Sequence, residues 1–517
     1  MKKIVAFALC SIMVTTLLAG CGGSSSDTGD SVSDTGATAS TDSGDYPTVV
    51  LAFMNWTGPP AGIDRIEEKI SEYTRETVGA NVQLEIMDAA SYNQNLTLML
   101  SSGEQVDIFN AISIGYTSSV NKGYTLDLEE DDLIATHGAD ILTTLDADYI
   151  NACRIDGILY GLPNQRDMAI GMYGFAIGAE YLDTIGYDYS SKYESEDSEI
   201  IYSTFDEINT IYAQLHEAYP DKYVLMPQEA TLTQGPAVDA VGGDNFGVLL
   251  DPENSMVVED MFTSEAFYEL CSMMYNWNQL GYMSQDALTD DTAATSQAKA
   301  GTVMSYLTAT KPGIKQQESN LCGREMIIFQ CGEDFMKASS VAAMPWCINS
   351  GTEDPVLAMK VLNAFYSDPY LSNLLCWGEE GVEYQKTEDG HITFAEGITA
   401  ESSQYYNNVN WQLPNQFIAE IWEGDSLDIW TKMETFNKES VKSKALGFAF
   451  DNSSVASEYT ALMNVYNEYG KALFYGFADP DTSIAEFESK LQSAGLQTYM
   501  EAKQAALDQW AADNGVK

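Results

Sequence analysis

Residues 49–109 alternate between apolar strand-like runs and amphipathic helical segments, and this alternation restricts the fold more than any other feature of the chain. Residues 49–54 form a continuous apolar run, which is typical of a strand buried on both faces. Ile63, Ile66 and Ile70 then recur at helical spacing. The pattern continues as a strand over 82–86, a helix over 92–100 and a strand over 106–109. This βαβαβ order predicts an α/β fold built on an open parallel sheet.

The polar loops after the first and third predicted strands are the first candidates for a binding site. Ligands of open parallel sheets bind beyond the carboxyl ends of the strands. The two loops cover residues 55–62 and 110–116. The core of a sheet has no need of a tryptophan in such a loop, so Trp56 either contacts a ligand or is simply exposed. We predict ligand contacts for Asn55, Trp56, Asn110 and Tyr116.

Helix start signals recur later in the chain. Thr204-x-x-Glu207 has the form of a capping box in front of an apolar stripe. Asp354-Pro355 has the form of an N-cap followed by a first-turn proline. Ser483-x-x-Glu486 is predicted to open the first of two closing helices. We therefore expect an α/β chain with a helix-rich C-terminal part and without internal repeats.

The N-terminus has the pattern of a secretion signal. Lys2 and Lys3 precede an almost wholly apolar stretch at residues 4–19. The stretch ends in Leu18-Ala19-Gly20-Cys21, which resembles the lipobox of bacterial lipoproteins, where a peptidase cuts before the cysteine and its thiol carries diacylglycerol. We expect a signal peptide at 1–20, then a lipidated Cys21 and a flexible Gly/Ser/Thr/Asp tether at 21–46. The alternative is an ordinary signal peptide with an incidental cysteine.

Charge and composition restrict the partners. The chain has 77 Asp and Glu against 25 Lys and Arg, which gives a formal net charge of −52. Binding nucleic acid or lying on anionic lipid needs clustered positive charge, so the sequence predicts neither. No stretch after the N-terminal one approaches the roughly 18–20 consecutive apolar residues of a membrane span. The predicted location is the outer face of the cell membrane, with the lipid as the anchor.

Catalytic and metal-binding patterns are scarce. The three histidines lack metal-type spacing, and no GxSxG, HExxH, P-loop or EF-hand pattern occurs. The sequence therefore predicts no metal site, no cofactor and no enzyme, while paired carboxylates for glycoside cleavage stay open among the 77 acids.

No CxxC motif occurs; Cys322 and Cys331 flank a short apolar run and either form a disulfide or stay reduced.

A resemblance to a known family rests on seven motifs in a fixed order. They are SSGEQVDIF at 101–109, DGILYGLP at 156–163, LGYMSQDALT at 280–289, KPG at 311–313, the stretch from DPVLAM to GVEY at 354–384, SKALGFAFD at 443–451 and the stretch from EYGKALF to ALDQW at 468–510. With these motifs the chain resembles the extracellular solute-binding lipoproteins of ABC importers. It is most similar to the family-1, sugar-type group whose Gram-positive members carry an extra C-terminal domain of unknown function.

The resemblance implies a periplasmic-binding-protein-like fold, in which two α/β lobes are joined by crossover strands with a ligand cleft between them. It places lobe I at 47–165 plus 311–380, and lobe II with a C-terminal helical extension at 166–310 plus 385–517. The segment 160–163 and the strand 302–307 are the expected crossovers. The implied function is capture of a carbohydrate by lobe closure and its delivery to the membrane permease subunits, by a protein that acts as a monomer.

Sugar sites combine aromatic planes with amides, carboxylates and arginine, and this chemistry extends the set of candidate residues. Arg166 follows the first expected crossover and either binds ligand or pairs with a surface acid. Trp346 and Trp411 lie in non-periodic segments, where a cleft position competes with plain packing. The further predicted ligand contacts are Gln165, Arg166, Tyr306, Lys311, Trp346 and Trp411.

A neutral oligosaccharide is the expected ligand. A polyanionic sugar would face the repulsive field of this acidic protein unless bases such as Arg166 or Lys311 line the cleft. Two hypotheses from other classes stay open. One is an anchored glycoside hydrolase or lyase, for which the external location and the many acids and aromatics argue; the other is a surface-binding lipoprotein without a transport role.

Overall fold

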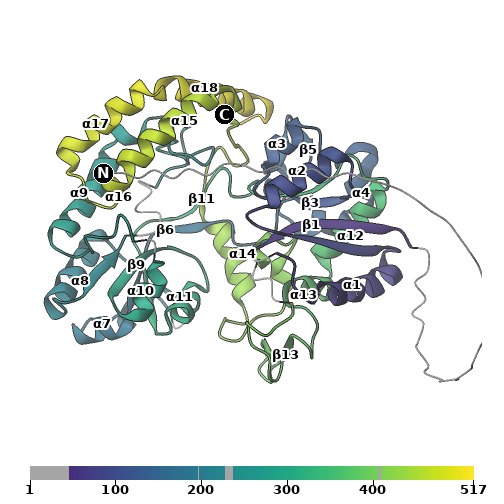
Figure 1. Cartoon of the computed structure of the whole chain (residues 1–517), viewed down its shortest axis with the longest axis horizontal. Coiled ribbons are helices and arrows are strands. Elements are labelled where there is room, and N and C mark those ends of the chain that lie inside the picture. Colours follow the sequence, from purple (N-terminus) through teal and green to yellow (C-terminus); the bar gives the residue numbers. More distant parts are fainter. Residues whose placement is uncertain are drawn as a thin grey trace, which may run out of the picture. The chain divides into compact units, whose positions relative to one another are not determined.

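Parallel pairing of the first three strands confirms the predicted βαβαβ unit. β1 (Thr48–Asn55) pairs in parallel with β2 (Asn81–Asp88) on one side and with β3 (Ile108–Asn110) on the other. β12 (Trp346–Ile348) adds an antiparallel strand beyond β3, so the strand order is β12-β3-β1-β2. Figure 1 labels β1 and β3 of this sheet. We call these four strands the first sheet. Local patterning predicts no strand at β12, because its pairing partner lies far away in the sequence.

The computed structural model describes residues 46–56, 58–195, 197–227, 237–290, 292–405 and 409–516. The predicted signal peptide at 1–20 lies outside these residues, as do the predicted lipidation of Cys21 and all of the predicted tether except Tyr46. In the described ranges, the helices are too short or too polar to cross a membrane.

Helices and a short hairpin pack on the first sheet through one large apolar core. Leu51, Phe53 and Ile108 have no exposed surface in it, as expected for strands covered on both faces. The elements around this core are α1 (Ile63–Thr77), α2 (Tyr92–Ser102), α3 (Tyr116–Asn121), α4 (Leu133–His137), α5 (Ala139–Thr144), α6 (Ala147–Ala152), β4 (Arg154–Ile155), β5 (Ile158–Leu159), α12 (Pro355–Ser367) and α13 (Pro369–Trp377). The Asp354 side chain accepts from the Leu357 N–H, so the predicted N-cap of α12 is confirmed.

A seven-stranded mixed sheet, the second sheet, is centred on β6 (Ile170–Gly178). β9 (Val303–Thr310) pairs with one edge of β6, and β10 (Met326–Gln330) and β11 (Asp334–Met336) pair with the other. The remaining strands are β7 (Ile200–Tyr202), β8 (Tyr223–Met226) and β15 (Val441–Lys442), and the helices are α7 (Ala179–Thr184), α8 (Phe205–Ala218), α9 (Glu265–Gln279), α10 (Ala294–Ala300) and α11 (Ile314–Cys322). Thr204 accepts from the Glu207 N–H at the start of α8, as predicted.

The two faces of the second sheet bury separate apolar clusters, and this separation decides against the possible Cys322–Cys331 disulfide. Cys322 belongs to the cluster with Ile328, whereas Cys331 packs against the cluster with Phe329, the neighbouring residue of β10 that points to the other face. Both cysteines carry free thiols. A disulfide needs the two Cβ atoms about 3.5–4.5 Å apart, which side chains on opposite faces of a sheet do not reach.

The C-terminal part is helical, as predicted, and packs on α9 and on the 238–262 segment. It consists of α15 (Ala456–Val465), a π-helical turn (Tyr466–Gly470), α16 (Lys471–Phe474), α17 (Pro480–Ser493) and α18 (Leu496–Asp513). The start of α17 differs from the predicted capping box at Ser483. Asp479 caps the helix and Pro480 is its first residue. The helix starts one turn before Ser483, because the Asp479 side chain accepts from the Asp481 N–H and proline suits the first helical position.

Three connections join the two sheets, and two of the predicted boundaries are wrong. Residues 160–169 lead from β5 to β6, residues 337–345 lead from β11 to β12, and α14 (Ile429–Glu439) leads to β15. The 302–307 strand is part of β9 inside the second sheet and is not a crossover. Residues 326–336 also pair in the second sheet rather than in lobe I.

The segment around the hairpin β13 (Tyr384–Lys386) and β14 (Ile392–Phe394) is expected in lobe II but packs with the first sheet. Tyr405, Leu413 and Ala419 pack in the core of the first sheet. The expected assignment of all residues after 385 to lobe II is therefore wrong for this segment. Because this segment has no helical or strand periodicity, its sequence does not indicate which of the two cores it packs against.

Candidate binding site

Two tryptophans meet at the carboxyl end of β1. Trp56 follows the strand directly and has 58% of its surface exposed. Its ring centroid lies 6.4 Å from that of Trp411, at an interplanar angle of 43°. Trp411 is partly buried against the core of the first sheet and lies in the 3-10 turn η5 (Asn410–Gln412). The pair presents aromatic surface where a parallel sheet is expected to bind its ligand.

A buried amide network holds Trp411 at this place. The Gln412 side chain donates from Nε2 to the Met54 carbonyl at 2.7 Å. The Gln412 carbonyl accepts from Trp346 Nε1 at 2.8 Å, from Asn110 Nδ2 at 3.2 Å and from Asn164 Nδ2. Buried polar groups are costly unless they are paired, so this arrangement favours one position of η5 relative to β1. The aromatic pair therefore has a rigid support.

A second polar cluster, the crossover cluster, lies where the 160–169 connection enters β6. Lys311 Nζ donates to Asp167 at 2.6 Å, and Arg166 donates to the Ser340 carbonyl at 2.9 Å, which ties two connections together. Burial raises the pKa of the Asp167 carboxyl, but the charges of Lys311 and Arg166 outweigh this effect and the pKa lies below its usual range. The carboxylate is thus charged at neutral pH and already paired.

The α14 helix completes the crossover cluster through Asn437. Its side-chain oxygen accepts from the backbone N–H groups of Met168 at 2.8 Å and Ala169 at 3.0 Å. Its amide nitrogen donates to the Arg166 carbonyl at 2.6 Å. One side chain therefore satisfies three backbone groups of a segment that has no strand partner at this point.

Two of the ten predicted contacts, Trp56 and Trp411, form the exposed aromatic pair, and two others support it from below the surface. Asn55 accepts from the Trp56 N–H at 2.7 Å, and Asn110 belongs to the amide network. Gln165 is buried and makes backbone hydrogen bonds to the 414–416 segment. Tyr116 is largely buried and donates to the Cys153 carbonyl at 2.5 Å, while Lys311 pairs with Asp167.

Three predicted contacts lie in places that do not suit ligand binding. Trp346 has 0% exposed surface, because it is the first residue of β12 and packs against Phe53. Tyr306 lies in the core of the second sheet, where it donates to Glu318 at 2.5 Å. The guanidinium of Arg166 donates to the carbonyls of Asp167 and Ser340, so the backbone holds it in place and it is not half of a surface ion pair.

Sequence reasoning missed Gln412 and Asn437. The only local signal for Gln412 is its position beside Trp411, and Asn437 has none, because an asparagine in a helix is usually exposed. Their roles depend on the Met54 carbonyl and on the 166–169 backbone, which lie far away in the sequence.

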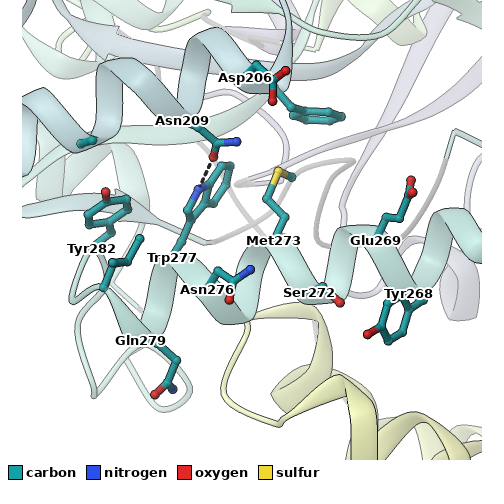
Figure 2. A pocket seen from close by; sticks show the side chains of 13 residues that line it. Asp206, Asn209, Tyr268, Glu269, Ser272, Met273, Asn276, Trp277, Gln279 and Tyr282 are labelled. Atoms are coloured by element: carbon teal, nitrogen blue, oxygen red, sulfur yellow. Dashed lines mark hydrogen bonds between the residues drawn. The ribbon is translucent and has the colours of Figure 1, made fainter.

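Another pocket lies elsewhere, between α8 and α9 (Figure 2). It has a volume of about 810 Å³, and Trp277 forms part of its floor with Nε1 donating to Asn209 at 2.7 Å. The pocket lies on the helices that cover the second sheet rather than at the carboxyl ends of parallel strands, so we do not take it as the candidate site. In the described part of the chain, no cluster of three or more His, Cys, Asp or Glu side chains is arranged to hold a metal ion.

Comparisons with known proteins agree with the predicted resemblance. Residues 444–512 match the model of a domain of unknown function, DUF3502. Over 503 residues, 96% of this chain and 96% of the relative, the sequence is 24% identical to a protein of Streptococcus pneumoniae serotype 4 (strain ATCC BAA-334 / TIGR4) described as a carbohydrate ABC transporter substrate-binding protein.

Solved structures show the same fold. The crystal structure of the N-glycan transport solute binding protein (NgtS) from Streptococcus pneumoniae matches with a TM-score of 0.76 at 22% identity, over 90% of this chain and 99% of that chain. An extracellular solute-binding protein from Bifidobacterium longum subsp. infantis matches with a TM-score of 0.64 at 14% identity, over 93% of this chain and 100% of that chain. The chain has the predicted periplasmic-binding-protein-like α/β fold.

Proposed function

We propose that the chain is an extracellular substrate-binding protein of an ABC importer and that it captures a neutral oligosaccharide. The observation that carries this proposal is the Trp56–Trp411 pair, held by buried amides at the carboxyl end of β1. Aromatic faces stack on the C–H faces of sugar rings, and a rigid support reduces the entropy cost of binding. The similarity to a carbohydrate-binding relative over 96% of the chain points to the same ligand class.

The surroundings of the pair favour a neutral sugar over an anionic one. Lys311 and Arg166, the two basic residues predicted for the cleft, are occupied by Asp167 and by backbone carbonyls. An anionic sugar would therefore meet the field of a chain with a formal charge of −52 without a free cation from this pair.

The remaining parts of the proposal concern transport and location. The connections 160–169 and 337–345, with α14, act as the hinge about which the two sheets close on the ligand. The closed form binds the membrane permease subunits. Cys21 carries the lipid that anchors the protein at the outer face of the membrane, and the protein is a monomeric binding protein without catalytic activity. The relatives named above are described as binding proteins and none as an enzyme.

A binding titration tests the proposal. Manno-, chito- and malto-oligosaccharides of one to five units are titrated by calorimetry into the wild type, Trp56→Ala and Trp411→Ala. We expect at least one series to bind the wild type and each tryptophan variant to bind about tenfold more weakly, since lost stacking is worth about 1.4 kcal/mol or more. Tyr223→Ala, which removes another exposed ring, should leave affinity unchanged.

The controls separate transport from other activities. New reducing ends released from any of these sugars would contradict the absence of catalysis. Binding of peptides or amino acids alone would contradict the sugar assignment. Loss of radioactive palmitate labelling in cells that express Cys21→Ser is the expected result for the lipid anchor.

A further inference from the structure

A small pocket lies where the C-terminal domain meets the elements of the first sheet. It has a volume of about 280 Å³ and is lined by the start of α3, by the 337–345 connection and by residues 447–452. The last of these segments lies near the start of the region, residues 444–512, that matches the domain of unknown function. α3 follows β3, so the pocket lies beside the same carboxyl edge of the first sheet as the Trp56–Trp411 pair.

The C-terminal domain is fixed to the loop 239–250 by a buried lysine. Lys503 of α18 donates to Asp244 at 3.1 Å and to the Gly247 carbonyl at 2.9 Å, and it has no exposed surface. Tyr499 donates to the same carboxylate at 2.7 Å. The helices α15 to α18 thus form a stable platform for residues 447–452.

The same segment approaches the elements of the first sheet very closely at a glycine. Gly447 has a φ of +97°, and a Cβ at this position would overlap the Ala152 carbonyl at the end of α6. Its N–H donates to the Ala338 carbonyl at 2.8 Å. Asn121 Nδ2 donates to Asp451 at 3.5 Å, the limit of a hydrogen bond. Residues 447–452 therefore form one wall of the pocket, and elements of the first sheet form the opposite wall.

The lining has the chemistry of a site for one sugar ring. Tyr116 and Phe450 supply aromatic surface, and small alanines leave room between the walls. The hydroxyls of Thr117, Ser118 and Ser339 have no hydrogen-bond partner in the described part of the chain, so they are available to a ligand. No lysine or arginine lines the pocket. Its volume is just below the roughly 300–1,000 Å³ of pockets for drug-sized ligands, which suits a single neutral ring.

We propose that this pocket is a subsite for the terminal neutral sugar unit of the oligosaccharide, and that residues 447–452 of the C-terminal domain form its specificity-determining wall. The inference rests on the proposed function and deepens it. It gives the C-terminal domain a role, because the domain selects the end and the length of the ligand. The Trp56–Trp411 pair binds another unit of the same chain.

The experiment compares sugars of different length on variants of the full-length chain. The wild type, Ala449→Leu and Thr117→Val are titrated with the best-binding series, from one to five units. Ala449 lines the pocket but is otherwise exposed, so leucine fills the pocket without disturbing the core. Ala505→Leu on the exposed face of α18 is the matched control.

We expect the wild-type affinity to rise at a particular chain length, as the pocket becomes occupied. Ala449→Leu and Thr117→Val should each lower the affinity for sugars of that length or longer by at least tenfold. Their affinity for shorter sugars should stay within twofold of the wild-type value. Ala505→Leu should bind all lengths like the wild type. Equal melting temperatures of the two leucine variants show that the fold is intact.

Three results would overturn the subsite. The first is that Ala449→Leu and Thr117→Val lose the same factor of affinity for sugars of every length. The second is that they lose affinity at no length, and the third is that the control Ala505→Leu loses as much affinity as they do. If Trp56→Ala weakens every sugar while Ala449→Leu weakens none, the proposed function stands and only the subsite fails. If the wild type binds no member of any series, both fail.

Discussion

Single buried polar residues join segments of this molecule that are far apart in the sequence. Gln412 joins η5 to β1, and Lys503 joins α18 to the loop 239–250. Each makes several hydrogen bonds from one side chain. Removing such a residue leaves its partners buried and unpaired, so we expect larger effects than its own contacts suggest.

Replacing Lys503 by methionine should lower the free energy of unfolding by about 3 kcal/mol. The methionine keeps most of the apolar stem, but two carbonyl oxygens lose the Lys503 donor and the Asp244 carboxylate loses its positive partner, keeping only neutral donors such as Tyr499. Urea unfolding followed by circular dichroism measures the loss. Lys490→Met, at an exposed position with a weak ion pair, should leave the free energy of unfolding essentially unchanged. Equal losses in the two variants would contradict this role of Lys503.

Asp260 makes stability depend on pH. Burial and the neighbouring Glu488 carboxylate raise the pKa of Asp260 to about 7, and Glu488 Oε2 is buried without a hydrogen-bond partner in the described residues. The folded chain therefore holds a proton that an unfolded aspartate, with a pKa of about 3.9, releases. The stability from this group is complete below pH 4 and is lost as the pH rises through about 7.

Asp260→Asn should remove this loss. The asparagine still accepts from the Phe262 N–H, so the cap of the turn is kept. The stability of the variant relative to wild type should rise between pH 5 and pH 8 by on the order of 1 kcal/mol, a value reduced by solvent screening. Asp479→Asn, at an aspartate cap of α17, is the control. A difference from wild type that stays constant with pH would refute the assignment.

At the scale of elements, the local strands and helices follow from the sequence, whereas their long-range partners do not. β1 covers the apolar run at 49–54. α8 starts at the capping box of Thr204, and α12 starts at the Asp354-Pro355 pair. These signals act over a few residues. The antiparallel β12 and the place of 326–336 in the second sheet depend on partners far away, so periodicity does not reveal them.

Just before β6, the 160–169 connection is held by the Asn437 side chain rather than by strand pairing. Asn437→Ala should lower the free energy of unfolding by about 2–4 kcal/mol, because it leaves two N–H groups and one carbonyl buried and unpaired. Chemical denaturation measures this change. Asn320→Ala, at an exposed position near the end of α11, should cost less than about 0.5 kcal/mol. A similar small effect at Asn437 would mean that the connection is held by other contacts.

At the scale of the whole molecule, the acidic surplus distinguishes classes of ligand. A neutral oligosaccharide carries no charge for the field of the protein to act on, so its affinity should change less than about twofold between 0.05 and 0.5 M salt. An oligomer of uronic acid should bind more weakly, and salt should increase its affinity, because screening reduces the repulsion. Calorimetry at the two salt concentrations measures both. A neutral ligand with a strong salt dependence would contradict the proposed site.

The sequence by itself determined the α/β class, the βαβαβ start and the carboxyl edge at which Trp56 lies, because periodicity and loop position are local properties. It also carried the family resemblance. Only the tertiary structure decided that Trp346 and Tyr306 are core residues, that Arg166 is occupied, and that Cys322 and Cys331 lie on opposite faces of a sheet. The physical reason is that the burial and pairing of a side chain depend on a second segment, distant in the sequence, that packs against it. The local sequence does not indicate which segment that is.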